Sequence, residues 1–151
     1  MLENMHILLY NIYCINLERC FKTRRQAREE AIILIFEKVF NNDSVEEILE
    51  LAAETRDLKP NDYIKTVFAG IYENLEEIDE IISENSIGWS IKRISKTALC
   101  VLRLAIFEIK FMDDIPVAVS INEAVELCKK YATADDASFV NGILSTVAKA
   151  I

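Results

Sequence analysis

Apolar side chains recur three and four residues apart along most of the chain, which places them on one face of an α-helix. The first such segment begins at Thr23, and Gln26 completes a capping box, the pairing typical of a helix N-terminus. This segment runs to about Asn41. A second capping box, formed by Ser44 and Glu47, predicts another helix directly afterwards.

A third, longer segment begins at Pro60, since proline suits the first turn of a helix. Its apolar stripe covers residues 63–78, and the pattern ends within residues 85–88. Acidic side chains gather opposite this stripe, at Glu73, Glu76, Glu77 and Glu80. Because they lie opposite an apolar face at helical spacing, we interpret them as a solvated face rather than as acid–base catalysts.

The C-terminal part of the chain continues the helical pattern. Residues 89–94 predict a short helical connector, and residues 97–112 a helix so apolar that it belongs in the middle of a bundle. A turn at 113–116 leads to a further helix, and Thr133 caps the last one. The chain is therefore predicted to be all-α, with six or seven helices and no strand. The break near 85–95 divides it into two halves of about three helices each.

Residues 1–21 differ from the rest, with no clean apolar period and no cap. They are interpreted as an N-terminal extension, either a loosely attached appendage or the product of a start codon placed upstream of the true one. The alternative is an extra helix that docks on the body or on a partner. The domain proper is expected to span residues 22–151.

Composition narrows the class of protein. Apolar residues make up 52% of the 151 residues and charged residues 28%, which excludes both a disordered chain and a membrane protein. Three glycines and two prolines are too few for the many turns of an all-β fold. Four scattered cysteines and one histidine offer no metal-binding cluster. With no secretory signal, the protein is expected to be cytoplasmic, with reduced thiols and with Cys100 and Cys128 in the core.

The net charge of −8 argues against non-specific nucleic-acid binding, but it hides an uneven distribution. Residues 19–28 hold five basic side chains and no acidic one. Arg24, Arg25 and Arg28 fall at the N-terminal end of a predicted helix, where the helix dipole disfavours cations. A cluster that opposes the local field indicates an anionic partner such as a phosphate backbone. Otherwise these are ordinary solvated charges, with Arg25 or Arg28 paired to Glu29 or Glu30.

Sequence features of a catalytic site are missing. The sole histidine, His6, lies in the N-terminal extension, and no glycine-rich phosphate loop is present. The protein is therefore expected not to be an enzyme and to need no cofactor. Gly142 interrupts a good helix, which suggests a close approach of another helix there. Phe139 nearby is either a core residue or, if partly exposed, a platform for stacking an RNA base.

Several stretches together resemble the NusB family, over about residues 22–150. They are TRRQARE (23–29), LRLAIFE (102–108), DIP (114–116), INEAVEL (121–127) and FVNGIL (139–144). The resemblance implies a NusB-like helical bundle of two three-helix subdomains. It also implies a non-enzymatic transcription antitermination and ribosomal-RNA transcription factor. Such a factor binds single-stranded boxA RNA with the ribosomal protein NusE and joins the antitermination complex on RNA polymerase.

The resemblance further implies roles for individual residues. RNA contacts are expected from Arg24, Arg25, Arg28, Phe36, Ser138 and Phe139. A surface facing NusE is expected on the middle helix, at Ala98, Arg103, Phe107 and Glu108. Asp136 and Ser138 stand where some members have a serine and a lysine, a change of charge that is expected to weaken RNA binding. A homodimer is also compatible with the family and could cover the arginines.

Two other functions remain to be weighed. One is a protein-only adaptor of the same fold whose RNA binding is weak or lost, which the acidic body favours. The other is the NusB-like RNA-binding domain that precedes the catalytic domain of some ribosomal-RNA cytosine methyltransferases. The chain ends at Ile151 without a methyl-donor domain, which argues against this last possibility.

Overall fold

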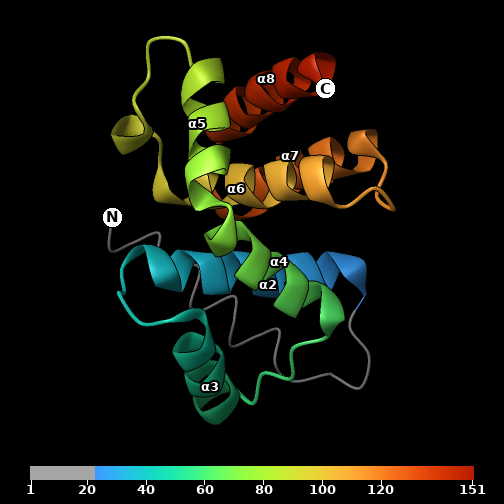
Figure 1. Ribbon diagram of the computed structural model, residues 1–151. Coiled ribbons are helices and arrows are strands. Elements are labelled where there is room, and N and C mark those ends of the chain that lie inside the picture. The colour runs from blue at the N-terminus through green and yellow to red at the C-terminus, as the bar shows by residue number, and fades with distance from the viewer. Residues whose placement is uncertain (1–22) are drawn as a thin grey trace.

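The computed structural model describes residues 23–151, so the expectations for the N-terminal extension lie outside the described residues. The described residues form seven α-helices and one 3-10 helix, with no strand, which confirms the all-α class (Figure 1). The elements are α2 (Arg24–Val39), α3 (Val45–Arg56), α4 (Asp62–Glu73), α5 (Leu75–Asn85), η1 (Ile91–Arg93), α6 (Lys96–Phe111), α7 (Val117–Tyr131) and α8 (Ala134–Ala150). None of these helices is long and apolar enough to cross a membrane.

Local sequence signals set the beginnings of most helices. The capping boxes of Thr23 with Gln26 and of Ser44 with Glu47 both form, and Thr133 forms a third with Asp136. In each case the two side chains accept hydrogen bonds from each other's backbone N–H groups, which would otherwise be unpaired at the helix start. These helix starts are confirmed.

The third predicted helix is different in the structure. It begins at Asp62 and is capped by Asn61, whose side chain accepts from the backbone N–H of Ile64, so Pro60 lies before the helix. It also ends at Glu73, where Asn74 separates α4 from α5. The Gly70 carbonyl accepts from both the backbone N–H of Asn74, at 3.1 Å, and the Asn74 side-chain amide, at 2.8 Å. The apolar stripe continues across the break, so periodicity alone did not reveal it.

This break moves the boundary between the two halves of the molecule. The N-terminal half comprises α2, α3 and α4, which pack on one another. Helix α5 packs against α6 and α8 and therefore belongs with the C-terminal half (Figure 1). The boundary is thus Asn74 rather than residues 85–95, and within residues 23–151 the halves contain three and four α-helices.

Helix α6 joins the halves. It packs against α2 and α4 on one side and against α5, α7 and α8 on the other. Every residue from 97 to 109 is buried, which confirms the expectation of a central helix. The buried stretch includes polar and charged residues as well as apolar ones, and these carry most of the specific contacts described below.

Glycine permits a close helix approach at one position, although not at the predicted one. A Cβ added to Gly70 of α4 would lie much closer to two ring carbons of Phe107 in α6 than the van der Waals contact distance between two carbon atoms. A Cβ at Gly142 would meet nothing within 4 Å, and Gly142 is exposed. The expected close approach at Gly142 is therefore wrong, and Gly70 holds that role between the two halves.

The two glycines form a matched pair of variants. Gly70→Ala is expected to lower the free energy of unfolding by about 1–3 kcal/mol, because the buried Phe107 ring must move. Gly142→Ala is expected to raise it by about 0.5–1 kcal/mol, because alanine is the better helix former at an open position. Urea unfolding followed by circular dichroism measures both. A stabilised Gly70→Ala would contradict the close packing of α4 on α6.

Candidate nucleic-acid interface

The basic cluster lies at the N-terminal end of α2. No acidic residue occupies the first turn of this helix, so nothing there offsets the positive end of its dipole. Arg24 and Arg25 are exposed, whereas Arg28 is only 4% exposed. One turn of helix thus separates two surface arginines from a core arginine.

Arg28 is part of a buried ion pair with Glu108 of α6. Its Nε donates to the two carboxylate oxygens at 2.9 and 3.2 Å, and its Nη2 donates to Oε1 at 2.8 Å. Burial by itself would lower the pKa of Arg28, but the bonds and charge of Glu108 outweigh it, so this pKa is raised and Arg28 stays charged. Arg28 has no surface to offer to RNA, and its predicted role as an RNA contact does not fit this structure.

Two hydroxyl groups complete the surroundings of Glu108. Tyr63 of α4 donates to Oε2 at 3.0 Å, and Ser120 of α7 donates to Oε1 at 3.2 Å. The carboxylate therefore binds groups from α2, α4 and α7 while it is itself carried by α6. Because Glu108 is 1% exposed, the prediction that it faces a protein partner is also wrong.

Arg24 lies on the outer side of the same network. Its guanidinium carbon stands 4.5 Å from the centre of the Tyr63 ring, a cation–π arrangement. The Tyr63 ring is in turn held in place by its hydroxyl bond to Glu108. Arg24 makes no ion pair among the described residues, so its five donors remain available to an incoming anion.

Arg25 is exposed but occupied. Its Nε and Nη2 donate to the carboxylate oxygens of Glu123 in α7, at 3.1 and 2.8 Å. The hydrogen bond from Arg25 holds the pKa of Glu123 below its usual range. The arginine side chain remains 64% exposed, so a phosphate can reach it and exchange with the carboxylate. The alternative drawn from the sequence paired Arg25 or Arg28 with Glu29 or Glu30. The structure instead pairs Arg25 with Glu123 and Arg28 with Glu108.

The remaining residues predicted from the family fall into two groups. Phe36 is a core residue with 7% of its surface exposed, and the exposed Phe40 covers it with ring centres 5.1 Å apart, so Phe36 is not available to RNA in this structure. Ala98 and Phe107 are buried as well, and Arg103 is held by Asp79 of α5 through two bonds of 2.8 Å. The four proposed partner residues are therefore core residues, since α6 is covered by its neighbours on all sides.

The two residues near the start of α8 that were predicted to contact RNA lie at or near the surface. Ser138 is exposed, and Phe139 is half-buried with its ring 6.1 Å from that of Trp89. The end of α7, just before this region, is tied to α2, because Lys130 bonds Glu29 at 2.7 Å. The structure thus leaves Arg24, Arg25, Ser138 and part of Phe139 at the surface, whereas Arg28 and Phe36 are buried.

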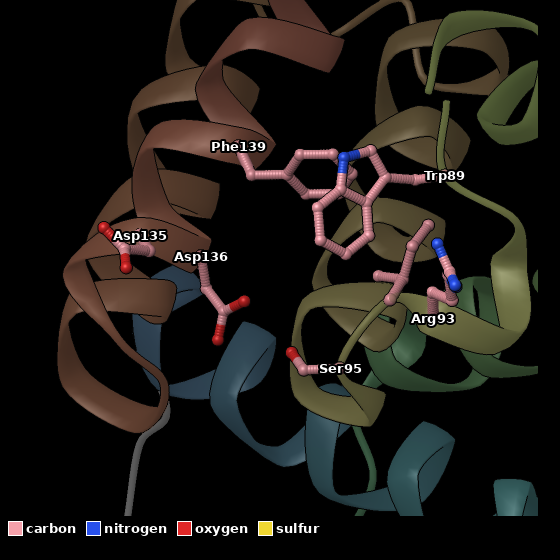
Figure 2. A pocket seen from close by; sticks show the side chains of 7 residues that line it. Trp89, Arg93, Ser95, Asp135, Asp136 and Phe139 are labelled. Carbon is pink, nitrogen blue, oxygen red and sulfur yellow. The ribbon is translucent and has the colours of Figure 1, made fainter. Parts of the chain in front are cut away.

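A small cavity opens beside Phe139 (Figure 2). It has a volume of about 170 Å³ and is lined by Trp89, Arg93, Ile94, Ser95, Asp135, Asp136 and Phe139.

Sequence reasoning missed Trp89, Arg93 and Tyr63. For Trp89 a signal was available, because it is the only tryptophan of the sequence and stands between a glycine and a serine in a short connector. Nothing in the pattern distinguished Tyr63 from its apolar neighbours. Within residues 23–151, no three potential metal-ligating side chains come together.

Comparison with known proteins gives a consistent picture. The model of the NusB family matches residues 25–149. A transcription antitermination protein NusB from Natranaerobius thermophilus is 48% identical over 131 residues, which cover 83% of this chain and 94% of that protein. The corresponding protein of Acetivibrio thermocellus is 48% identical over 128 residues, with 83% of this chain and 88% of that protein covered.

Solved structures agree with the sequences. The NusB structure from T. maritima superposes with a TM-score of 0.76 and 36% identity, over 86% of this chain and 93% of that one. A chain from a crystal structure of the antitermination factors NusB and NusE in complex with dsRNA gives a TM-score of 0.75 and 29% identity. That match covers 85% of this chain and 97% of the other.

The different positions of the arginines lead to a stability prediction. Arg28→Ala is expected to lower the free energy of unfolding by about 3–5 kcal/mol, because it leaves the Glu108 carboxylate buried without its cation. Arg24→Ala removes only an exposed stack and is expected to cost less than about 1 kcal/mol. Arg28→Lys, which keeps the charge but not the two-pronged bond, should fall between them. Equal losses for the two alanine variants in urea unfolding would contradict the assigned roles.

Proposed function

This chain belongs to the NusB family, and we propose that it acts as a transcription antitermination factor that binds boxA RNA together with the ribosomal protein NusE. The relatives that it resembles over most of their length are antitermination proteins. A related NusB chain is found with NusE and double-stranded RNA. The proposal includes action in the cytoplasm, as part of the antitermination complex on RNA polymerase, without catalysis.

The observation that carries the proposal is the exposed Arg24 on its Tyr63 platform. A guanidinium held in place by an aromatic ring loses less side-chain entropy when it binds a phosphate than a free one does. Its position at the positive end of α2 adds the partial charge of the helix N-terminus to its own. Arg24 is therefore the first RNA phosphate contact that we assign, and Arg25 the second, after exchange of Glu123 for phosphate.

The start of α8 is the second surface that we assign to the RNA. Phe139 offers a half-buried ring for stacking, and Ser138 offers an exposed hydroxyl beside it. Because the four residues predicted to meet NusE are buried, NusE would have to bind through other residues. The middle helix would support such a surface only by positioning the helices that cover it.

The second candidate is the protein-only adaptor. Two observations favour it: the surface arginine Arg25 is already neutralised by Glu123, and Asp135 and Asp136 stand in the first turn of α8. Both features weaken attraction for an RNA backbone. This candidate predicts binding of NusE with no preference for boxA over a scrambled sequence, even in the pair.

Salt dependence tests the role of the two surface arginines. Each phosphate contact on single-stranded RNA contributes about 0.7 to the log–log slope of affinity against salt. Arg24→Ala and Arg25→Ala are each expected to flatten the slope by about that amount, and the double variant by about 1.4. Fluorescence anisotropy with labelled boxA RNA, with and without NusE, measures it. The control is Lys149→Ala, which removes one positive charge at the far end of α8. Unchanged slopes in both arginine variants would overturn the assignment.

The Glu123 carboxylate provides a complementary test. Glu123→Gln is expected to raise RNA affinity about two- to fivefold, because Arg25 no longer has to break an exposed ion pair. Glu126→Gln on the same helix removes the same charge from a carboxylate that binds Lys129, not an arginine of α2. It is expected to raise affinity less. Equal effects of the two variants in the same anisotropy titration would show that only the net charge matters.

A further inference from the structure

We propose that the cavity beside Phe139 is a binding site for one unpaired RNA base that carries an amino group. This inference rests on the proposed function, since it names what the start of α8 recognises. Two aromatic rings, two carboxylates and a cation with no ion pair among residues 23–151 line the cavity, which has a volume of about 170 Å³. That space suits a single ring system and not a folded element of another protein.

The aromatic side of the cavity is made by Trp89 and Phe139. Their ring centres lie 6.1 Å apart and the rings are inclined by 59°, so each ring leaves part of its face uncovered by the other. Trp89 is 53% exposed although it is the only tryptophan of the chain and a large apolar residue. An exposed aromatic face at the edge of a cavity is the element that single-stranded RNA sites use for base stacking.

The opposite side of the cavity is acidic and selects against phosphate. Asp135 and Asp136 occupy the first turn of α8, so the positive end of this helix is already compensated. In Figure 2 the Asp136 carboxylate points into the space between α8 and Ser95, whereas that of Asp135 points away. A carboxylate accepts hydrogen bonds only, so the group that enters must donate. Adenine, cytosine and guanine present an amino group, whereas the only donor on the pairing edge of uracil is an N3–H between two carbonyl oxygens that a carboxylate repels.

Arg93 supplies the remaining part of a nucleotide site. It is exposed at the end of η1 and lines the same cavity. Within the described residues no carboxylate neutralises it. It can therefore hold the phosphate attached to a base that lies on Trp89. A basic or aromatic side chain of a protein would use the carboxylate or the rings but would leave this cation without a partner.

The single tryptophan gives this site its own signal. Titration of the full-length chain with boxA RNA is expected to quench the fluorescence of Trp89, because a stacked base lies against its ring. In a series of RNAs with one abasic position each, one RNA should lose both the quenching and about 5- to 100-fold in affinity. Uracil at that position should restore only part of the affinity.

Variants assign the effect to the cavity. Trp89→Leu and Phe139→Leu should each weaken binding of the intact RNA about 5- to 100-fold, and should no longer distinguish it from the abasic RNA. Asp136→Asn should relax the preference for an amino-bearing base. Asp135→Asn is the matched control, because it removes the same charge from the neighbouring residue. Asp135→Asn should change the affinity for all RNAs equally and should leave the preference for an amino-bearing base unchanged.

Three results would overturn the proposal. If the wild-type chain prefers boxA but Trp89 is not quenched and Trp89→Leu binds as tightly, the site is wrong while the antitermination function stands. If Trp89→Leu weakens binding of NusE in the absence of RNA, the cavity receives a protein instead. If the wild-type chain shows no preference for boxA even with NusE, both the site and the proposed function fall.

Discussion

A buried carboxylate, that of Glu108, is the point on which the rest of the structure depends. It lies in the fully buried stretch of α6 and accepts hydrogen bonds from Arg28, Tyr63 and Ser120, which come from three other helices. A charge in this position would cost several kcal/mol if it were unpaired, so the folded state requires all three helices to be in place. The ion pair adds little to net stability over an apolar core, but it restricts how α2, α4 and α7 pack around α6.

The same network reaches the surface. Tyr63 donates its hydroxyl to Glu108 inside the protein, and its ring carries Arg24 outside. The core thus positions the arginine that we propose as an RNA contact, without contributing such a contact itself. This arrangement explains why two arginines four residues apart, Arg24 and Arg28, have different roles although both lie at the basic end of α2. One neutralises the carboxylate, and the other is held over the ring that the carboxylate orients.

An acidic protein that binds RNA needs recognition beyond charge. With a net charge of −8, and with Arg25 paired to Glu123, the attraction for a phosphate backbone is local and modest. In the site that we propose, stacking and hydrogen bonding at the start of α8 supply a contribution that does not depend on long-range attraction. The carboxylates there weaken binding to any RNA, yet they favour a base with a donor, so the acidic composition serves selectivity at the expense of affinity.

Local features could be predicted from the sequence, and long-range ones could not. Capping boxes and apolar periodicity involve residues three or four apart, so the helices that begin at Arg24, Val45 and Ala134 could be predicted before any contact was known. The family motifs led to the correct fold. Exposure depends on partners far along the chain: Arg28 is buried because Glu108, eighty residues away, meets it. The break at Asn74 and the pairing of Trp89 with Phe139 were decided likewise by tertiary packing, since no periodic pattern records which neighbour covers a side chain.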